Sequence, residues 1–312
     1  MSTTQEKAPV ADPTWNSPEG EAPDAPRSVW GWVTLVWRLP ITLIWVFGGL
    51  VIHLTVRLIE RPIFGLRRPM TPFITQVVCK GTLLLLAIPL RITGKPMRGR
   101  GAVVANHVSW LDIFALNAPQ RVYFVSKAEV ASWPGIGWLA RATGTVFIRR
   151  SARDARLQKE VFEARLRAGH HLCFFPEGTN SDGVRLLPFK PTLFAAFFTH
   201  GLSEILSIQP VTLVYIAPPG RDARFYGWWG DMDFASHLLK TLAAPRQGAV
   251  TLCYHTPMKV SDFADRKSLG HELEAFFSPT PNITARVTYA SSATTLTHFY
   301  PLLTARFAEA LA

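Results

Sequence analysis

The segment Asn-His-Val-Ser-Trp-Leu-Asp at 106–112 places a histidine and an aspartate five positions apart. On a regular helix, side chains at this spacing point about 140° from each other. The two can therefore meet only if His107 lies in a loop and Asp112 in the first turn of the next helix. Ser109 supports a helix start there, because Ser109 and Asp112 have the spacing of a capping box. Asp112 could then accept a hydrogen bond from one imidazole nitrogen and leave the other as a base. Taken alone, the spacing also fits a capping aspartate beside an ordinary loop histidine.

Two further segments place polar groups at the ends of expected strands. The run Phe-Phe-Pro-Glu-Gly-Thr ends an apolar strand with Glu177, Gly178 and Thr179. Loops at strand ends are where α/β folds hold ligand-contacting groups, and glycine lets backbone N–H groups approach an anion. Residues 144–150 form a strand that ends in two arginines, of which Arg150 suits bidentate phosphate binding. Each segment alone also fits a tight turn or a surface arginine.

Short apolar runs alternate with helical patterns after residue 100. The segment 154–168 carries Leu157, Val161, Ala164 and Ala168 at helical spacing, which predicts a helix with this stripe on its inner face. Alternation of strands and helices predicts an α/β fold, in which a mixed sheet is covered by helices. An N-terminal helical membrane anchor is expected to precede this fold. The expected strands are 102–105, 122–125, 145–148, 172–175, 209–215 and 250–254.

The membrane anchor is expected from two apolar segments. Residues 39–56 are 18 residues with His53 as their only titratable side chain, and as a helix they would measure about 27 Å against a bilayer core of about 30 Å. This segment is either membrane-spanning or re-entrant. Residues 73–90 carry Lys80 and Pro89 and fit an interfacial helix or an ordinary buried one. Arginines follow both segments, so two spans would break the positive-inside rule.

The expected organisation has four parts. Residues 1–28 hold prolines and acidic residues and predict a disordered tail. Membrane-associated helices should occupy 29–95, and the α/β catalytic domain 96–277. The extension 278–312 shows no sustained periodicity. Three isolated cysteines fit a reducing compartment, so we expect a membrane protein whose catalytic domain lies on the cytoplasmic face.

Charge and missing motifs narrow the function classes. The net charge is +11, which indicates an anionic partner. No RNA-recognition signature occurs, so lipid or an acidic carrier is favoured over nucleic acid. The sequence lacks G-x-S-x-G and phosphate-loop motifs, which argues against a serine hydrolase and a nucleotide-binding enzyme. His170 and His171 have no HExxH or cysteine partner, so no metal is expected.

Taken together, these segments resemble the glycerol-phosphate acyltransferase superfamily, and within it the 1-acylglycerol-3-phosphate (lysophosphatidic acid) O-acyltransferases. The family's N-H-x4-D motif is matched by His107 and Asp112. Its G-x-x-F-I-x-R motif is matched at 144–150, and its F-P-E-G-T motif at 175–179. A fourth motif, an apolar strand with a proline, is similar to 208–211.

The resemblance implies roles for these residues. His107 would be the general base on the acceptor hydroxyl, with Asp112 holding its tautomer. The hydroxyl would attack the thioester of acyl-CoA or acyl-carrier protein directly, with no acyl-enzyme and no cofactor. The acceptor is a lysolipid at the membrane bilayer. The residues expected to bind it are Arg150, Glu177, Gly178, Thr179 and, at another strand end, Lys127.

One departure from the family pattern concerns the acceptor. Many members follow F-P-E-G-T with arginine, but this chain has Asn180, although Arg185 and Lys190 are near in sequence. Three functions therefore stay open. The first is acyl transfer to 1-acyl-glycerol-3-phosphate, giving phosphatidic acid. The second is transfer to lyso-ornithine lipid, whose acceptor carries an amine. The third, from another class, is a non-catalytic membrane-anchored scaffold.

Overall fold

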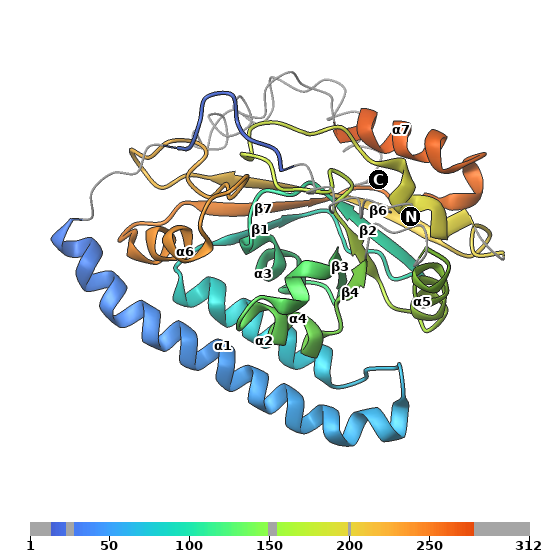
Figure 1. The fold of residues 1–312 in the computed structure, drawn as a ribbon, viewed down its shortest axis with the longest axis horizontal. Helices are drawn as coiled ribbons and strands as arrows, with labels where there is room; N and C mark the ends of the chain where they lie inside the picture. The colour runs from blue at the N-terminus through green and yellow to red at the C-terminus, as the bar shows by residue number, and fades with distance from the viewer. Residues whose placement is uncertain (1–13, 23–27, 149–154, 199–200, 278–312) are drawn as a thin grey trace, which may run out of the picture.

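The computed structural model describes residues 14–22, 28–148, 155–198 and 201–277. Its centre is an eight-stranded mixed sheet in the order β1-β7-β6-β2-β5-β3-β4, with β8 paired to β6 (Figure 1). The α/β fold expected from the sequence is confirmed. The strands are β1 (Leu90–Thr93), β2 (Gly101–Ala105), β3 (Tyr123–Lys127), β4 (Val146–Ile148), β5 (Leu172–Phe174), β6 (Ser207–Ile216), β7 (Ala249–Tyr254) and β8 (Met258–Lys259).

The central strands are parallel, which fixes where loops gather. β2 pairs in parallel with β5 and β6, and β3 pairs in parallel with β5 and β4. β7 is antiparallel to β6, and β1 follows β7 in parallel. The carboxyl ends of five parallel strands therefore share one edge of the sheet, where α/β folds place ligand-contacting loops.

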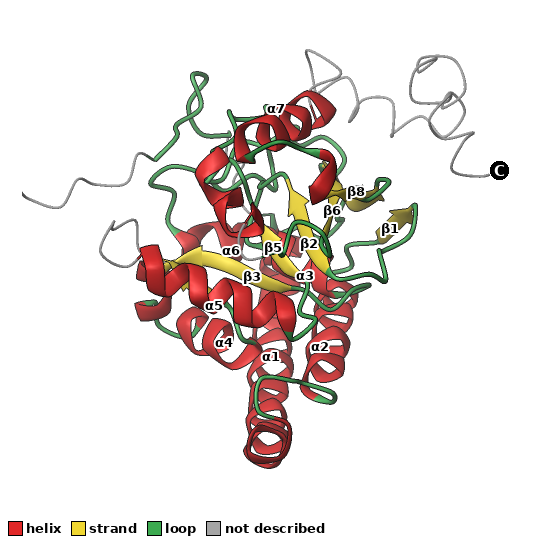
Figure 2. Ribbon diagram, turned by 90° about the vertical axis from the view of Figure 1, so that its right-hand side faces the viewer, coloured by secondary structure: helices red, strands yellow, loops and turns green. Residues whose placement is uncertain are grey.

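Helices cover both faces of this sheet (Figures 1 and 2). Along β2, Val103 and Ala105 belong to one hydrophobic cluster, whereas Ala102 and Val104 belong to the other, as the alternation of side chains along a strand requires. The first face carries α1 (Val29–Phe64), α2 (Thr71–Leu85), α3 (Leu111–Asn117), α4 (Ile136–Thr143) and α6 (Phe234–Ala243). The second carries α5 (Ala155–Arg167), α7 (Arg266–Phe277) and the 3-10 segment η2 (Pro191–Phe198). Two short 3-10 segments complete the described elements, η1 (Ala128–Ser132) and η3 (Val260–Asp262).

The six expected strands each lie within two residues of an observed strand at both ends. Two strands were missed. β1 falls inside the range 29–95 that was assigned to membrane helices, so the sheet begins before the expected boundary. β1 is a four-residue edge strand whose last three residues are exposed, and it therefore leaves no alternating pattern to read.

The inner face predicted for α5 was wrong. Leu157 and Val161 are 63% and 40% exposed, while Phe162 and Leu166 are buried. Arg165 lies on the buried side, where its guanidinium donates to the carbonyl of Gly144 at 2.6 Å. A buried arginine within the inner stripe made that face look polar in the sequence.

Residues 14–22 lie in the range expected to be a disordered tail, but in the structure they rest on the α/β domain. The rings of Trp15 and Trp229 are 6.4 Å apart, Ser17 is buried, and Glu19 pairs with Arg185. For these nine residues the structure differs from the expectation. One aromatic and one ionic contact hold them on the domain, and the average composition of the tail does not predict such contacts. The rest of 1–27 and all of 278–312 lie outside the described residues.

Helix α1 exposes apolar side chains and buries polar ones. The described helices include one that is long and apolar enough to cross a membrane, and it is α1. Its inner face holds Arg38, His53 and Glu60. Arg38 donates to the carbonyl of Ala244 at 2.8 Å, and Nε2 of His53 lies 2.9 Å from the carbonyl of Ala142. Glu60 accepts from Thr71 at the start of α2, from its N–H at 3.1 Å and its hydroxyl at 2.6 Å.

Candidate functional site

His107 and Asp112 meet as the loop-to-helix argument requires. Nδ1 of His107 and Oδ2 of Asp112 are 2.8 Å apart, with His107 in the loop after β2 and Asp112 in the first turn of α3. The carboxylate reaches back to the N–H of Ser109 at 3.1 Å, which is one half of a capping box, although the helix itself begins at Leu111. The predicted geometry of the pair is confirmed.

The Asp112 carboxylate is fixed by four hydrogen bonds. Oδ2 accepts from Nδ1 of His107 and from the N–H groups of Val108, at 2.8 Å, and Ser109. Oδ1 accepts from the hydroxyl of Tyr215 at 2.8 Å. The Asp112 side chain is 0% exposed, whereas that of His107 is 19% exposed. The second imidazole nitrogen therefore faces the protein surface, while the Asp112 carboxylate is shielded from water.

The His107 ring is also held by stacking. Its centroid lies 3.9 Å from that of Phe175, with the planes 9° apart, and Phe175 in turn stacks on Phe124 at 5.9 Å. Phe175 directly follows β5 and Phe124 belongs to β3, so two neighbouring strands support the ring. With the hydrogen bond to Asp112, this stack allows the imidazole few orientations.

Glu177 lies where a head-group contact was expected, but its carboxylate points inward. Oε1 accepts from the N–H of His107 at 2.7 Å, and Oε2 accepts from the N–H of Leu187 at 2.8 Å. The residue is 1% exposed, and burial raises the pKa of Glu177 to about 8, against the pull of its two N–H donors. In this geometry Glu177 fastens the backbone of His107, and its burial keeps the carboxylate away from a head group.

The backbone after His107 is anchored by two more loops. The carbonyl of His107 accepts from the N–H of Ser181 at 2.9 Å and from its hydroxyl at 3.2 Å. The carbonyl of Val108 accepts from the N–H of Trp228 at 3.0 Å. A Cβ on Gly183 would come within 2.7 Å of Val108, so the chain passes too close there for a side chain. The imidazole is thus carried by a backbone with little freedom to shift.

The remaining predicted residues surround this centre. Gly178 has a φ of +71°, a left-handed conformation that favours glycine, and Thr179 lies half-buried in the same turn. Lys127 ends β3, on the edge of the sheet that carries His107. Arg150 lies outside the described residues.

Asn180 and Arg185 bear on the acceptor. Nδ2 of Asn180 is buried and has no hydrogen-bond partner among the described residues. Arg185 donates to Asp182 at 2.7 Å and to the hydroxyl of Ser17 at 3.0 Å, and it pairs with Glu19. This pairing lowers the pKa of Glu19 to about 2. Arg185 therefore sits between two carboxylates and is not an open cation.

Sequence reasoning missed the contributions of Asn106 and Tyr215. The side chain of Asn106 exchanges two hydrogen bonds with the backbone of Leu213, at 3.0 and 2.8 Å, and so ties the end of β2 to β6. Tyr215 lies 103 positions from the carboxylate it contacts. One signal was available for it, because a tyrosine in a buried strand needs a partner for its hydroxyl.

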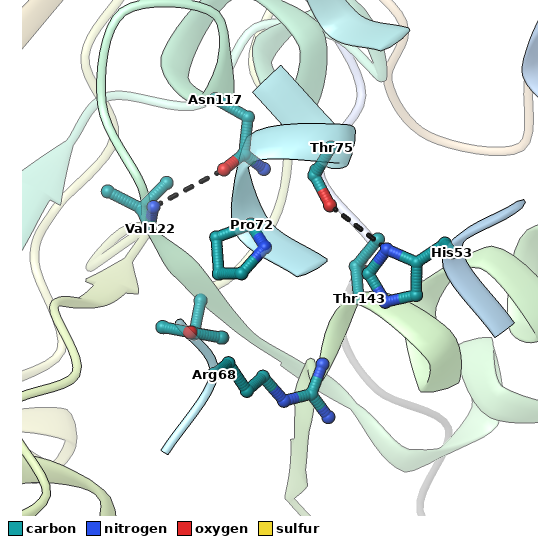
Figure 3. Close-up of a pocket in the computed structure, with 8 residues that line it drawn as sticks. His53, Arg68, Pro72, Thr75, Asn117, Val122 and Thr143 are labelled. Carbon is teal, nitrogen blue, oxygen red and sulfur yellow. Dashed lines mark hydrogen bonds between the residues drawn. The ribbon is translucent and has the colours of Figure 1, made fainter. Parts of the chain in front are cut away.

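A small pocket lies elsewhere, between α1, α2, α4 and the start of β3 (Figure 3). Its lining includes His53, whose Nδ1 is 3.5 Å from the hydroxyl of Thr75, and Asn117, which accepts from the N–H of Val122 at 3.3 Å. None of its lining residues belongs to the cluster around His107. Among the described residues, no group of three or more His, Cys, Asp or Glu could hold a metal ion.

The arrangement around His107 suits general-base chemistry. A neutral imidazole whose Nδ1–H is held by a buried carboxylate presents Nε2 as a proton acceptor. A hydroxyl group that reaches this nitrogen can lose its proton as its oxygen attacks an electrophilic carbonyl. The described site therefore fits acyl transfer to an alcohol.

Comparison with known proteins agrees with this chemistry. The family model described as Acyltransferase matches residues 90–229. The lyso-ornithine lipid O-acyltransferase of Rhodobacter capsulatus is 56% identical over 263 residues, which cover 84% of this chain and 95% of that protein. The 1-acyl-sn-glycerol-3-phosphate acyltransferase of Neisseria gonorrhoeae is 42% identical over 134 residues, which cover 41% of this chain and 51% of that protein.

A solved structure shares the fold. The crystal structure of the 1-acyl-sn-glycerophosphate acyltransferase from Thermotoga maritima matches with a TM-score of 0.55 and 20% identity, over 84% of this chain and 96% of that one. At this identity the likeness concerns the fold alone, whereas the sequence relatives establish the family. The chain belongs to the acyltransferase family that includes the lyso-ornithine lipid O-acyltransferase of Rhodobacter capsulatus, and it is an O-acyltransferase of lysolipids by type.

Proposed function

We propose that the protein transfers a fatty acyl chain from an acyl thioester to the free hydroxyl of a lysolipid, with His107 as general base and Asp112 as the group that orients it. The observation that carries this proposal is the 2.8 Å contact between Nδ1 of His107 and a carboxylate that is fully buried. A buried carboxylate that accepts four hydrogen bonds keeps one tautomer of the imidazole in place.

The proposed reaction needs no covalent enzyme intermediate. Nε2 of His107 takes the proton from the lysolipid hydroxyl while the hydroxyl oxygen attacks the thioester carbonyl. The tetrahedral adduct then expels the thiolate, and the imidazolium returns its proton to the sulfur. The products are the ester and the free thiol of the carrier. Acyl-CoA and acyl-carrier protein both supply such a thioester, and both stay candidates for the donor.

For the acceptor, two observations favour lyso-ornithine lipid. Asn180 brings an uncharged amide where many family members have arginine, and Arg185 is engaged by Glu19 and Asp182. An ornithine head group carries an ammonium and no phosphate, so it does not require a free cation at this position. The relative from Rhodobacter capsulatus, named for this acceptor, supports the same choice. The second candidate, 1-acyl-glycerol-3-phosphate, rests on the relative from Neisseria gonorrhoeae.

We also propose that α1 lies along the membrane surface on the cytoplasmic side. The polar contacts of Arg38, His53 and Glu60 fasten its inner face to the domain over 22 residues, which is about 33 Å of helix. A helix perpendicular to the bilayer would pull these contacts, and the elements that make them, into the hydrocarbon core. A helix in the plane of the interface keeps them out of lipid while its apolar side enters it.

The test uses purified full-length protein in lipid, with the parent and His107→Ala compared side by side. Each is given lyso-ornithine lipid or 1-acyl-glycerol-3-phosphate, in combination with acyl-CoA or acyl-carrier protein. We expect transfer by the parent, preference for lyso-ornithine lipid, and a loss of about 10²- to 10⁴-fold in kcat for His107→Ala. Both proteins should bind lipid vesicles equally.

Each outcome decides part of the proposal. Near-normal turnover by a folded His107→Ala protein would refute the general base. Preference for 1-acyl-glycerol-3-phosphate would keep the chemistry and replace the acceptor. Folded parent protein that transfers to neither lysolipid from either donor would overturn the proposed function.

A further inference from the structure

Tyr215 belongs to β6 but lies beside the loop that carries the proposed base. The last residue of β2, Ala105, pairs with Val211, and the Asn106 side chain extends the contact to Leu213. Two residues further along β6, Tyr215 reaches Asp112 with its hydroxyl. The strand therefore delivers a fixed hydrogen-bond donor to the side of Asp112 that faces away from His107.

The two oxygens of the Asp112 carboxylate accept hydrogen bonds from different sets of donors. Oδ2 has three donors, His107 and two backbone N–H groups. At Oδ1 the structure places the Tyr215 hydroxyl, and within the described residues no second donor reaches this atom. We propose that Tyr215 is a positioning residue for the proton transfer, holding Asp112 in its rotamer and spreading part of its negative charge away from His107. This inference rests on the proposed function of His107.

Burial makes the hydroxyl a permanent donor. Tyr215 is 6% exposed and Asp112 is 0% exposed. Desolvation, together with the neighbouring Asp112 charge, raises the pKa of Tyr215 well above its usual 10. The hydroxyl keeps its proton over the whole range in which an imidazole titrates, so its hydrogen bond to Oδ1 does not switch with pH.

Loss of this donor should alter the imidazole through the carboxylate. Without Tyr215, the negative charge of Asp112 concentrates on Oδ2, and the protonated imidazole is stabilised more strongly. The carboxylate also gains freedom to rotate, which loosens the ring that it orients.

A buried tyrosine hydroxyl can also serve the fold alone, and Tyr226 offers a matched control for that role. Its ring lies 5.5 Å from that of Tyr215, and it is 0% exposed. Its hydroxyl donates to Gln247 at 2.7 Å and accepts from the N–H of Gly248 at 2.8 Å. Tyr226→Phe thus removes a bonded, buried hydroxyl from the same cluster without touching Asp112.

The experiment compares the full-length parent with Tyr215→Phe and Tyr226→Phe, using the lysolipid and thioester on which the parent turns over best. We expect Tyr215→Phe to lower kcat about 10-fold or more, because a hydrogen bond to a charged group is lost. KM for the lysolipid should stay within about twofold, since Tyr215 is buried and its hydroxyl donates to Asp112. The acidic limb of the kcat/KM profile should move up by about half to one pH unit. Tyr226→Phe should leave both kcat and the pH profile near those of the parent.

A double-mutant cycle isolates the route of the effect. In an Asp112→Asn background, Tyr215→Phe should cost less than about threefold in kcat, because the group it acts through is already changed. Equal losses in both backgrounds would overturn the proposal. So would a parent-like pH profile for Tyr215→Phe, or a Tyr215→Phe protein that fails to fold while Tyr226→Phe folds, since the hydroxyl would then be structural. A parent without transferase activity would instead contradict the proposed function.

Discussion

The His107 site and helix α1 both bury ionisable groups, but these groups hold different parts of the structure in place. Around His107, the carboxylates of Asp112 and Glu177 accept hydrogen bonds from the chain that carries the imidazole. In α1, Arg38 and Glu60 bond to the ends of neighbouring helices. The first set fixes one ring, whereas the second fixes a 36-residue helix to the domain.

The two regions also differ in what they expose. The site presents part of one polar ring to its surroundings, whereas α1 presents tryptophan, isoleucine and valine, among them Trp30 at 72% and Ile44 at 73% exposed. Large exposed apolar surfaces mark contact with lipid or a partner. The contacts of the buried charges therefore indicate which part of the protein a segment is attached to, and the exposed apolar side chains indicate whether it faces water or lipid. Chemistry and membrane binding should thus be separable by mutation.

The largest separable effect is expected on the outer face of α1. Replacing Ile44 and Ile52, 73% and 58% exposed, by aspartate removes two apolar side chains from the lipid side and adds two charges. Because a buried isoleucine contributes about 1.5–3 kcal/mol, partitioning onto vesicles should fall at least about 100-fold. Vesicle flotation measures this, while turnover on detergent-dispersed lysolipid should stay within about threefold.

Leu157→Asp is the matched control for that experiment, because this residue is 63% exposed on α5, on the other side of the sheet. It should leave flotation unchanged. Flotation that survives the α1 double substitution would mean that α1 is not the lipid-facing surface.

A smaller effect is expected at the acceptor end of the site. Asn180→Arg restores a cation beside the turn that follows β5, where a phosphate could accept a charge-assisted bidentate hydrogen bond. The ratio of turnover on 1-acyl-glycerol-3-phosphate to turnover on lyso-ornithine lipid should rise about 10-fold. Asn180→Gln keeps the amide and should not change the ratio. If Asn180→Arg lowers turnover on both lysolipids equally, position 180 does not choose between them.

The sequence predicted those parts of the fold whose causes are local. Six strands and the meeting of His107 with Asp112 follow from apolar runs and from a five-residue spacing across a helix start. β1 was missed because it has four residues and one neighbour, β7, whose pairing spans about half the chain. The apolar stripe on α5 was misjudged because Arg165 is buried and donates to the carbonyl of Gly144. The hydrophobic periodicity of the helix does not predict a contact with another segment.

The site shows the same division between local and distant causes. The motif around Glu177 marked the right turn, but the direction of its carboxylate depends on the backbone of His107, 70 positions away. Tyr215 was invisible for the same reason, since its role exists only once β6 lies beside β2. The contact of residues 14–22 with Arg185 likewise depends on a surface that the tail's own composition does not describe.

The smallest predicted effect concerns Glu177 and stability. Its pKa is raised from 4.5 to about 8, so between these values the folded protein holds a proton that the unfolded chain has released. Stability contributed by this proton is complete below about pH 4.5 and is lost as pH rises through 8. The buried His170 and His237 act oppositely, because burial lowers the pKa of each to about 3 and folding is then favoured as pH rises toward 6.5.

Measurements of Glu177 between pH 7 and 8.5 lie above the pH range in which these two histidines change the stability. There the melting temperature should fall by about 2–4 °C more in the parent than in Glu177→Gln, in keeping with roughly 1 kcal/mol. Equal slopes for the two proteins would show that Glu177 is already ionised at pH 7, with its two N–H donors outweighing its burial.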